Sequence, residues 1–160
     1  MFISFADRFK DQGYINWLKG TLFLQYTKEG IEDFVERTSK EYHDTIKSDI
    51  LAASNCPSRC QLETFRRDKF TCPYHQCDTL KTKLLFTSRS GRLQWNNSKL
   101  QDMKSSPTEL AKLFLPGFCK QYSGPTEADC TAVLSLMDDC LHFGDKMDKP
   151  DLVQKVQYCA

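Results

Sequence analysis

Four cysteines in one short segment constrain this chain more than any other feature. Cys56 and Cys60 form one close pair and Cys72 and Cys77 form a second, so the spacing is C-x3-C-x11-C-x4-C. Structural Zn²⁺ takes four tetrahedral ligands, and two tight turns that each present a pair of thiolates can supply all of them. We therefore interpret the segment as a structural zinc site, with His75 as an alternative ligand. An ion held by four protein ligands would stabilise the loop rather than activate water.

Two simpler interpretations of the cysteines are disulfide bonds and ordinary buried thiols. Disulfides need an oxidising compartment, but residues 1–25 lack the charged start, uninterrupted apolar stretch and cleavage site of a signal peptide. Buried thiols need apolar neighbours, and the stretch between Cys60 and Cys72 is polar, with four charged residues at positions 66–69. Both observations favour zinc over the alternatives.

The length and composition fit one mainly α-helical domain. A chain of 160 residues buries roughly 70% of its extended surface, enough for a hydrophobic core. It is 40% hydrophobic and 27% charged, with only 7 Gly and 6 Pro, as expected of a soluble helical protein. We expect a single helical domain over residues 1–160 that carries residues 56–104 as a basic zinc-loop insert. Because there is no long apolar run and no signal peptide, we expect a cytoplasmic or nuclear protein without membrane contact.

Positive charge is concentrated in this insert. Residues 56–104 carry 10 Lys and Arg against 4 Asp and Glu, a net charge of +6, whereas the whole chain is only +1. Such an insert fits an anionic partner, either RNA or an acidic protein surface, and it also fits a solvated face with no partner. The candidate nucleic-acid contacts are Arg59, Arg66, Arg67, Lys69, Lys81 and Lys83.

Aromatic residues lie among these basic residues, at Phe65, Phe70, Tyr74, Phe86 and Trp95. Exposed rings on a basic surface stack on the bases of single-stranded nucleic acid. Rings beside a small zinc loop also form its miniature core. The pattern therefore supports either role.

Before the cysteines, apolar residues recur at intervals of three and four for nearly fifty residues, which predicts helix. Gly20 and Gly30 interrupt the pattern, so we expect two or three helices there. We expect the last of them to include residues 38–51 and to end before Asn55 and Pro57.

After the cysteines, the pattern predicts a short helix over residues 78–86. Residues 84–87 and 93–95 could instead pair as a short β-hairpin around Ser90–Gly91.

Three further helices are expected in the last third of the chain. A brief one opens at Pro107, the strongest opens near Pro125–Thr126, and a final one starts within residues 148–160. The strongest helix has one continuous apolar face, which we expect to be buried with its two cysteines as core thiols. This face consists of Cys130, Val133, Leu134, Met137, Cys140 and Leu141.

Short motifs spread along the chain form an ordered series. They are Tyr14-Ile15-Asn16-Trp17, Ser58-Arg59-Cys60, Gly91-x-x-x-Trp95, Ala111-Lys112-x-Phe114-x-Pro116, Leu134-Ser135-Leu136 and Cys140-x-His142-Phe143. In this order they resemble the vertebrate family of the uncharacterised protein from chromosome X open reading frame 38. The resemblance implies a HEPN-like helical bundle with a cysteine-rich insert, and it supplies no established activity.

HEPN domains that cleave RNA use an Arg-polar-x-x-x-His motif, and the resemblance implies that this motif would follow Ala160. Arg37 and His43 are six residues apart, which makes their side chains diverge on a helix, so we expect a surface arginine and a packing or capping histidine. The chain also lacks a P-loop, G-x-S-x-G, G-x-G-x-x-G and H-E-x-x-H.

We therefore expect a non-catalytic, zinc-stabilised helical module that binds protein or RNA, with a homodimer as one option and no small-molecule substrate evident. The alternative is a fragment of a HEPN-type ribonuclease whose motif lies beyond the chain end.

Overall fold

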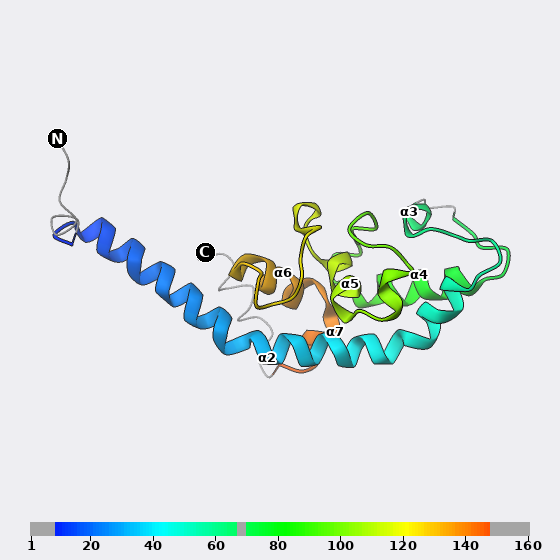
Figure 1. The fold of residues 1–160 in the computed structure, drawn as a ribbon, viewed down its shortest axis with the longest axis horizontal. Coiled ribbons are helices and arrows are strands. Elements are labelled where there is room, and N and C mark those ends of the chain that lie inside the picture. Colours follow the sequence, from blue (N-terminus) through cyan, green and yellow to red (C-terminus); the bar gives the residue numbers. More distant parts are fainter. Residues whose placement is uncertain (1–8, 67–69, 148–160) are drawn as a thin grey trace.

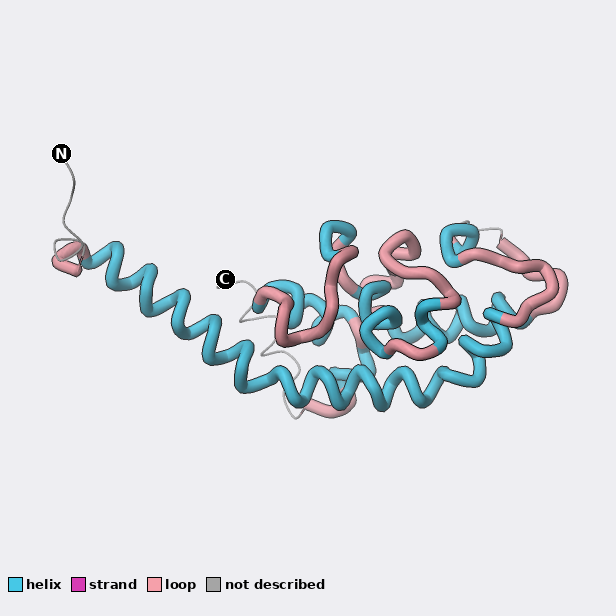
Figure 2. The backbone as a smooth tube through the Cα atoms, viewed as in Figure 1, coloured by secondary structure: helices cyan, strands magenta, loops and turns pink. Residues whose placement is uncertain are grey.

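The computed structural model describes residues 9–66 and 70–147, and within them the protein is mainly helical, as predicted (Figure 2). One long helix, α2 (Gln12–Ser54), extends across the molecule, and the other elements stack along its C-terminal half (Figure 1). In chain order these are α3 (Leu62–Phe65), α4 (Gln76–Thr87), the 3₁₀ turn η1 (Asp102–Lys104), α5 (Pro107–Ala111), the 3₁₀ turns η2 (Lys112–Phe114) and η3 (Gly117–Cys119), α6 (Cys130–Asp139) and α7 (Leu141–Gly144).

Helix α2 begins at an aspartate cap. The Asp11 carboxylate accepts hydrogen bonds from the N–H groups of Gly13 (2.7 Å) and Tyr14 (3.3 Å). The helix then continues through Gly20 and Gly30, so the prediction of two or three helices is wrong. Each glycine costs only about 1 kcal/mol relative to alanine in a helix interior. Side-chain pairs four residues apart support the helix on both sides of the glycines: Gln12 with Asn16, Gln25 with Glu29, and Lys28 with Glu32.

The C-terminal half of α2 supplies one wall of the core. Its buried residues recur every three or four positions and are Val35, Thr38, Tyr42, His43, Ile46, Ile50 and Ala53. Helices α4, α5 and α6 pack against this half. His43 is buried with its Nε2 2.7 Å from the carbonyl oxygen of Met103, whereas Arg37 is exposed. The interpretation of these two residues as a packing histidine and a surface arginine is confirmed. The helix ends before Asn55, also as predicted.

Helix α4 confirms the helix predicted over residues 78–86 and extends it by a few residues. Leu80 and Leu84 lie one turn apart on its inner face and are fully buried. This face packs against α2, which fixes the start of α4, and with it Cys77, close to the C-terminal end of α2.

The predicted β-hairpin is wrong. Residues 84–87 belong to α4, and Leu93 and Trp95 lie in a loop where both are buried. Among residues 9–66 and 70–147 the only strand-like pairing is an isolated bridge between Ser88 and Cys140. Burial of the α4 face outweighed the weak alternation that suggested a strand.

Helices α5 and α6 begin at capping residues. Helix α5 starts at Pro107, as predicted, and Ser106 is its N-cap. Helix α6 starts at Cys130 rather than near Pro125, because the side chain of Asp129 caps it. The helix predicted within residues 148–160 lies outside the described residues.

The apolar face predicted for α6 is largely buried. Val133, Leu134 and Met137 are buried within the helix, and Cys140 is buried directly after it. Leu141 is exposed because the helix ends at Asp139 and the extended backbone of Cys140 redirects the chain into α7. Cys130, at the start of the helix, is half-buried.

Residues 56–104 contribute to the same core as the rest of the chain. Leu80, Leu84 and Met103 are fully buried and belong to one hydrophobic cluster with Val35 and Leu136. The division into one domain with an insert stays a prediction. No helix of the described residues is both long enough and apolar enough to cross a bilayer.

Candidate metal centre

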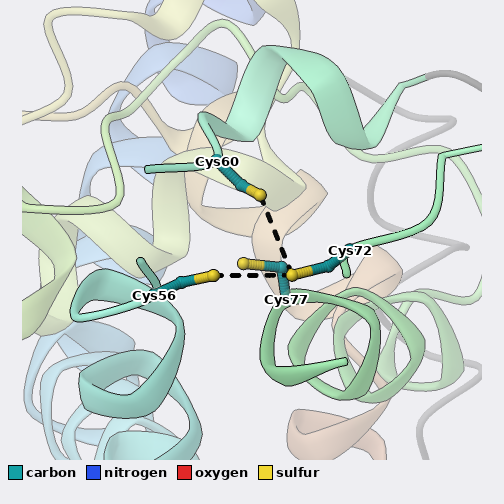
Figure 3. Close-up of side chains that lie close together, drawn as sticks. All are labelled: Cys56, Cys60, Cys72 and Cys77. Carbon is teal, nitrogen blue, oxygen red and sulfur yellow. Dashed lines mark hydrogen bonds between the residues drawn. The ribbon is translucent and has the colours of Figure 1, made fainter. Parts of the chain in front are cut away.

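The four cysteines of the predicted zinc site meet where α2, α3 and α4 come together (Figure 3). Cys56 follows the end of α2, Cys60 precedes α3, Cys72 lies in a loop, and Cys77 lies in the first turn of α4. All four sulfur atoms are within 4.8 Å of one another. The sulfur of Cys72 is 3.4 Å from that of Cys56 and 3.9 Å from that of Cys60.

These distances fit a single ion. A tetrahedron with metal–sulfur bonds of 2.3 Å has edges of about 3.8 Å, and the two measured sulfur–sulfur distances lie on either side of this value. Four cysteines in this arrangement could therefore hold a metal ion without further ligands.

The two cysteine pairs lie on matching backbone turns. In the first, the N–H of Arg59 donates to the carbonyl of Cys56 (2.9 Å); in the second, the N–H of His75 donates to the carbonyl of Cys72 (2.9 Å). Arg59 and His75 have φ angles of 48° and 58°, the only positive values among the non-glycine residues that the structure describes. A positive φ strains the backbone of a residue that is not glycine. Each turn has such a residue three positions after its first cysteine, so the two turns share one local structure.

Hydrogen bonds and burial shift the pKa values of the cysteine thiols in different directions. Burial raises the pKa of Cys77 far above its ordinary value, and hydrogen bonds with the thiols of Cys60 and Cys56 raise it further. Burial also raises the pKa of Cys60. At Cys72 burial acts in the same direction, but hydrogen bonds from the backbone N–H groups of Cys77 and Tyr74 outweigh it and lower the pKa to about 7. The protein alone therefore favours the thiolate of Cys72, whereas burial favours the neutral thiols of Cys60 and Cys77.

His75 lies outside the group of sulfur atoms. Its side chain is 78% exposed, and its Nδ1 is 3.2 Å from the Asp78 carboxylate. The other oxygen of Asp78 accepts the backbone N–H of Cys72 at 2.8 Å. Asp78 therefore ties the second turn to the start of α4, a role that sequence reasoning missed although an acidic residue in the first turn of a helix is a recognisable signal.

The structure excludes one of the two alternatives to a metal site, disulfide bonds, but not the other, ordinary buried thiols. The seven cysteines that the structure describes are all free, so none of them forms a disulfide. Cys56, Cys72 and Cys77 are buried in the hydrophobic core, so the polar sequence around them does not prevent burial. Burial alone would suit ordinary thiols, whereas the mutual approach of four sulfurs is the feature that a metal requires.

The basic residues singled out from the sequence lie in different places. Arg59 lines a groove of about 730 Å³ beside Cys56 and Cys60. Lys83 forms an ion pair with Asp49 of α2. Arg67 and Lys69 lie outside the described residues.

Two of the predicted contacts come together in a second groove. Arg66 and Lys81 line this groove, which has a volume of about 660 Å³, together with Arg92. Sequence reasoning missed Arg92, because only the folded chain brings it beside α4.

The aromatic residues near this groove form a small core. Phe65 and Trp95 are buried, with ring centroids 5.5 Å apart, and Phe70 lies 5.0 Å from Phe65. The Nζ of Lys81 is 5.7 Å from the centroid of the Phe70 ring. The buried rings of Phe65 and Trp95 therefore pack as core, whereas Tyr74 and Phe86 are exposed.

Comparison with known proteins places the chain in a family. Residues 8–160 match the family described as "Domain of unknown function (DUF4559)". The chain belongs to this family. It is 28% identical over 145 residues to the mouse "Uncharacterized protein CXorf38 homolog", and this alignment covers 86% of the chain and 44% of the mouse protein. The resemblance found in the sequence motifs is therefore confirmed, although the chain spans less than half the length of this relative. No solved structure matches the chain.

Proposed function

We propose that Cys56, Cys60, Cys72 and Cys77 bind one structural Zn²⁺ in a non-catalytic helical module that binds an anionic macromolecule. The convergence of the four sulfur atoms within 4.8 Å carries the metal part of the proposal. Thiolates are soft ligands that select zinc over magnesium or calcium, and four of them in a tetrahedral arrangement are typical of structural zinc. Four protein ligands would leave no position for a catalytic water.

Metal analysis tests this part. Reduced protein, as purified, should contain close to one zinc per chain. Cys60→Ser should lower the zinc content, whereas the matched variant Cys140→Ser should retain it, because Cys140 is a buried thiol outside the group of four. A folded, reduced sample without zinc, or equal zinc loss in both variants, would exclude the site.

The partner part of the proposal is supported by the groove that Arg66, Lys81 and Arg92 line. None of its ten lining residues is acidic. A groove with three cationic side chains, and with no carboxylate among the described residues that line it, favours an anionic partner by charge complementarity. An acidic protein segment suits it better than single-stranded RNA, because the rings of Phe65 and Trp95 are buried and cannot stack on bases.

Binding of two probes separates these partners. A polyglutamate peptide should bind with an affinity that falls as salt rises, and the double variant Arg66→Glu/Arg92→Glu should weaken it by about tenfold or more. The matched variant Lys40→Glu/Lys120→Glu reverses two exposed charges outside the groove and should bind normally. Tighter binding of oligouridylate than of the peptide would replace the protein partner with RNA, and no binding of either would end the partner proposal without affecting zinc.

The HEPN-like bundle and the ribonuclease fragment stay predictions from the resemblance. The buried position of His43, whose Nε2 lies 2.7 Å from the Met103 carbonyl oxygen, supports a structural rather than a catalytic role for this histidine, six residues after Arg37. A cleavage assay on single-stranded RNA with the 160-residue chain checks this, and we expect no activity above a buffer control.

A further inference from the structure

The four cysteines of the candidate metal centre differ in how far solvent reaches them. Cys56, Cys72 and Cys77 are buried, with exposed fractions of 3%, 0% and 0%, whereas Cys60 is half-buried. Cys60 also lines the groove of about 730 Å³ beside the site. A small oxidant in the solvent therefore reaches Cys60 before it reaches the other three cysteines.

A second sulfur lies close enough to Cys60 to react with it. Both thiols are free in the structure, and the sulfur of Cys72 is 3.9 Å from that of Cys60 (Figure 3). A disulfide bond is about 2 Å long, so the two sulfurs need to approach by roughly 2 Å to form one. Cys60 lies in the loop before α3 and is the sulfur that moves, because the Asp78 carboxylate holds the backbone N–H of Cys72 (2.8 Å).

Cys130 provides an internal comparison. It is half-buried like Cys60, but it lies outside the group of four cysteines. Burial raises the pKa of Cys130, which keeps it a neutral thiol, whereas a cysteine bound to a metal ion is a thiolate. The thiolate is the form that peroxides oxidise, so Cys60 in the metal-loaded protein should react ahead of Cys130.

We propose that Cys60 and Cys72 form a redox switch, in which a peroxide oxidises Cys60, a disulfide to Cys72 follows and the metal ion is released. This switch rests on the proposed zinc site, which keeps the cysteines deprotonated. Only Cys56 and Cys77 remain as ligands after the disulfide forms, and two thiolates do not complete the tetrahedral coordination of structural zinc. Reversible disulfides of this kind are typical of redox-sensing proteins in reducing compartments.

The chemistry balances with hydrogen peroxide as the oxidant. The Cys60 thiolate attacks one peroxide oxygen, so that an S–O bond forms, the O–O bond breaks and hydroxide leaves; Cys60 is then a sulfenic acid. The Cys72 thiolate attacks the sulfur of Cys60, so that the S–S bond forms, the S–O bond breaks and a second hydroxide leaves. Both hydroxides take protons from the solvent and become water. The two sulfurs together lose two electrons, and these electrons reduce the peroxide.

Peroxide treatment of reduced, zinc-loaded protein tests the switch. Close to one zinc per chain should pass to a chromogenic chelator, and peptide mapping without reductant should find a Cys60–Cys72 disulfide. Dithiothreitol, a dithiol, should reduce this disulfide and restore zinc binding. Alkylation after denaturation should show that Cys60 is oxidised at least about tenfold faster than Cys130, because an ordinary thiol is only slightly ionised at pH 7. The matched variant Cys130→Ser should release zinc at the wild-type rate.

Dimedone, which traps sulfenic acids, identifies the sulfur that is attacked first. Added together with the peroxide, it should label Cys60 and leave Cys72 unlabelled. Label on Cys72, or a disulfide between any other pair of the four cysteines, would overturn the assignment.

The zinc content measured before peroxide is added separates this switch from the site itself. Zinc that stays bound at a peroxide concentration that oxidises Cys130 would overturn the switch and leave the zinc site in place. Folded, reduced protein without zinc would exclude the site and the switch together.

Discussion

Cys60→Ser should release the segment between α2 and α4 while leaving the α2–α4 core folded. The four cysteines tie the end of α2 to α3 and to the start of α4. Within this segment Leu62 and Phe65 are almost fully buried. Burying two such side chains contributes only about 3–6 kcal/mol, and fixing the backbone of the residues between Cys56 and Cys72 costs at least as much. Without metal the segment therefore lacks enough stabilisation of its own.

The magnitude follows from the loss of one of four ligands. Because binding of a structural ion contributes to folding, we expect Cys60→Ser to lower the free energy of unfolding of zinc-loaded protein by more than about 4 kcal/mol. Cys140→Ser, at a buried thiol outside the group of four cysteines, should cost about 1–3 kcal/mol. Cys60 is the least buried of the four cysteines, so its substitution leaves the smallest packing defect to confuse the comparison.

Urea unfolding and hydrogen exchange measure the two effects. Protection should be lost for the backbone of α3 and for Cys72 in Cys60→Ser and in wild-type protein treated with a chelator, whereas Ile46 and Ile50 in α2 should remain protected because the α2–α4 core stays folded. Unchanged exchange in the chelated protein, or equal destabilisation by the two serine variants, would refute the reasoning.

Three further predictions concern the core, the second turn and pH. Leu84→Ala should lower the free energy of unfolding by about 2–5 kcal/mol, since Leu84 is fully buried between α4 and α2, whereas Phe86→Ala on the exposed face should change it by no more than about 0.5 kcal/mol, as urea denaturation will show. Asp78→Ala removes the acceptor for the Cys72 N–H and should weaken zinc binding by about 10- to 100-fold in a competition assay with a chromogenic chelator. Because burial raises the pKa of Cys60 and Cys77, their thiols must lose protons when zinc binds, so the zinc affinity should fall as the pH falls. A chelator competition that shows no pH dependence would contradict this.

The sequence predicts best where the signal is local. The cysteine spacing identifies all four residues whose sulfurs converge, because two tight turns bring each pair together whatever the rest of the fold does. Pro107 marks the start of α5, and the sequence before Pro57 marks the end of α2. In each case a few neighbouring residues determine the backbone.

The sequence predicts poorly where distant residues decide. Gly20 and Gly30 carry a helix-breaking tendency of about 1 kcal/mol each, which the hydrogen-bonded ladder of a 43-residue helix overrides. The supposed hairpin fails because Leu84 packs against α2, a contact that no local pattern shows. Arg92 joins Arg66 and Lys81 only in the folded chain.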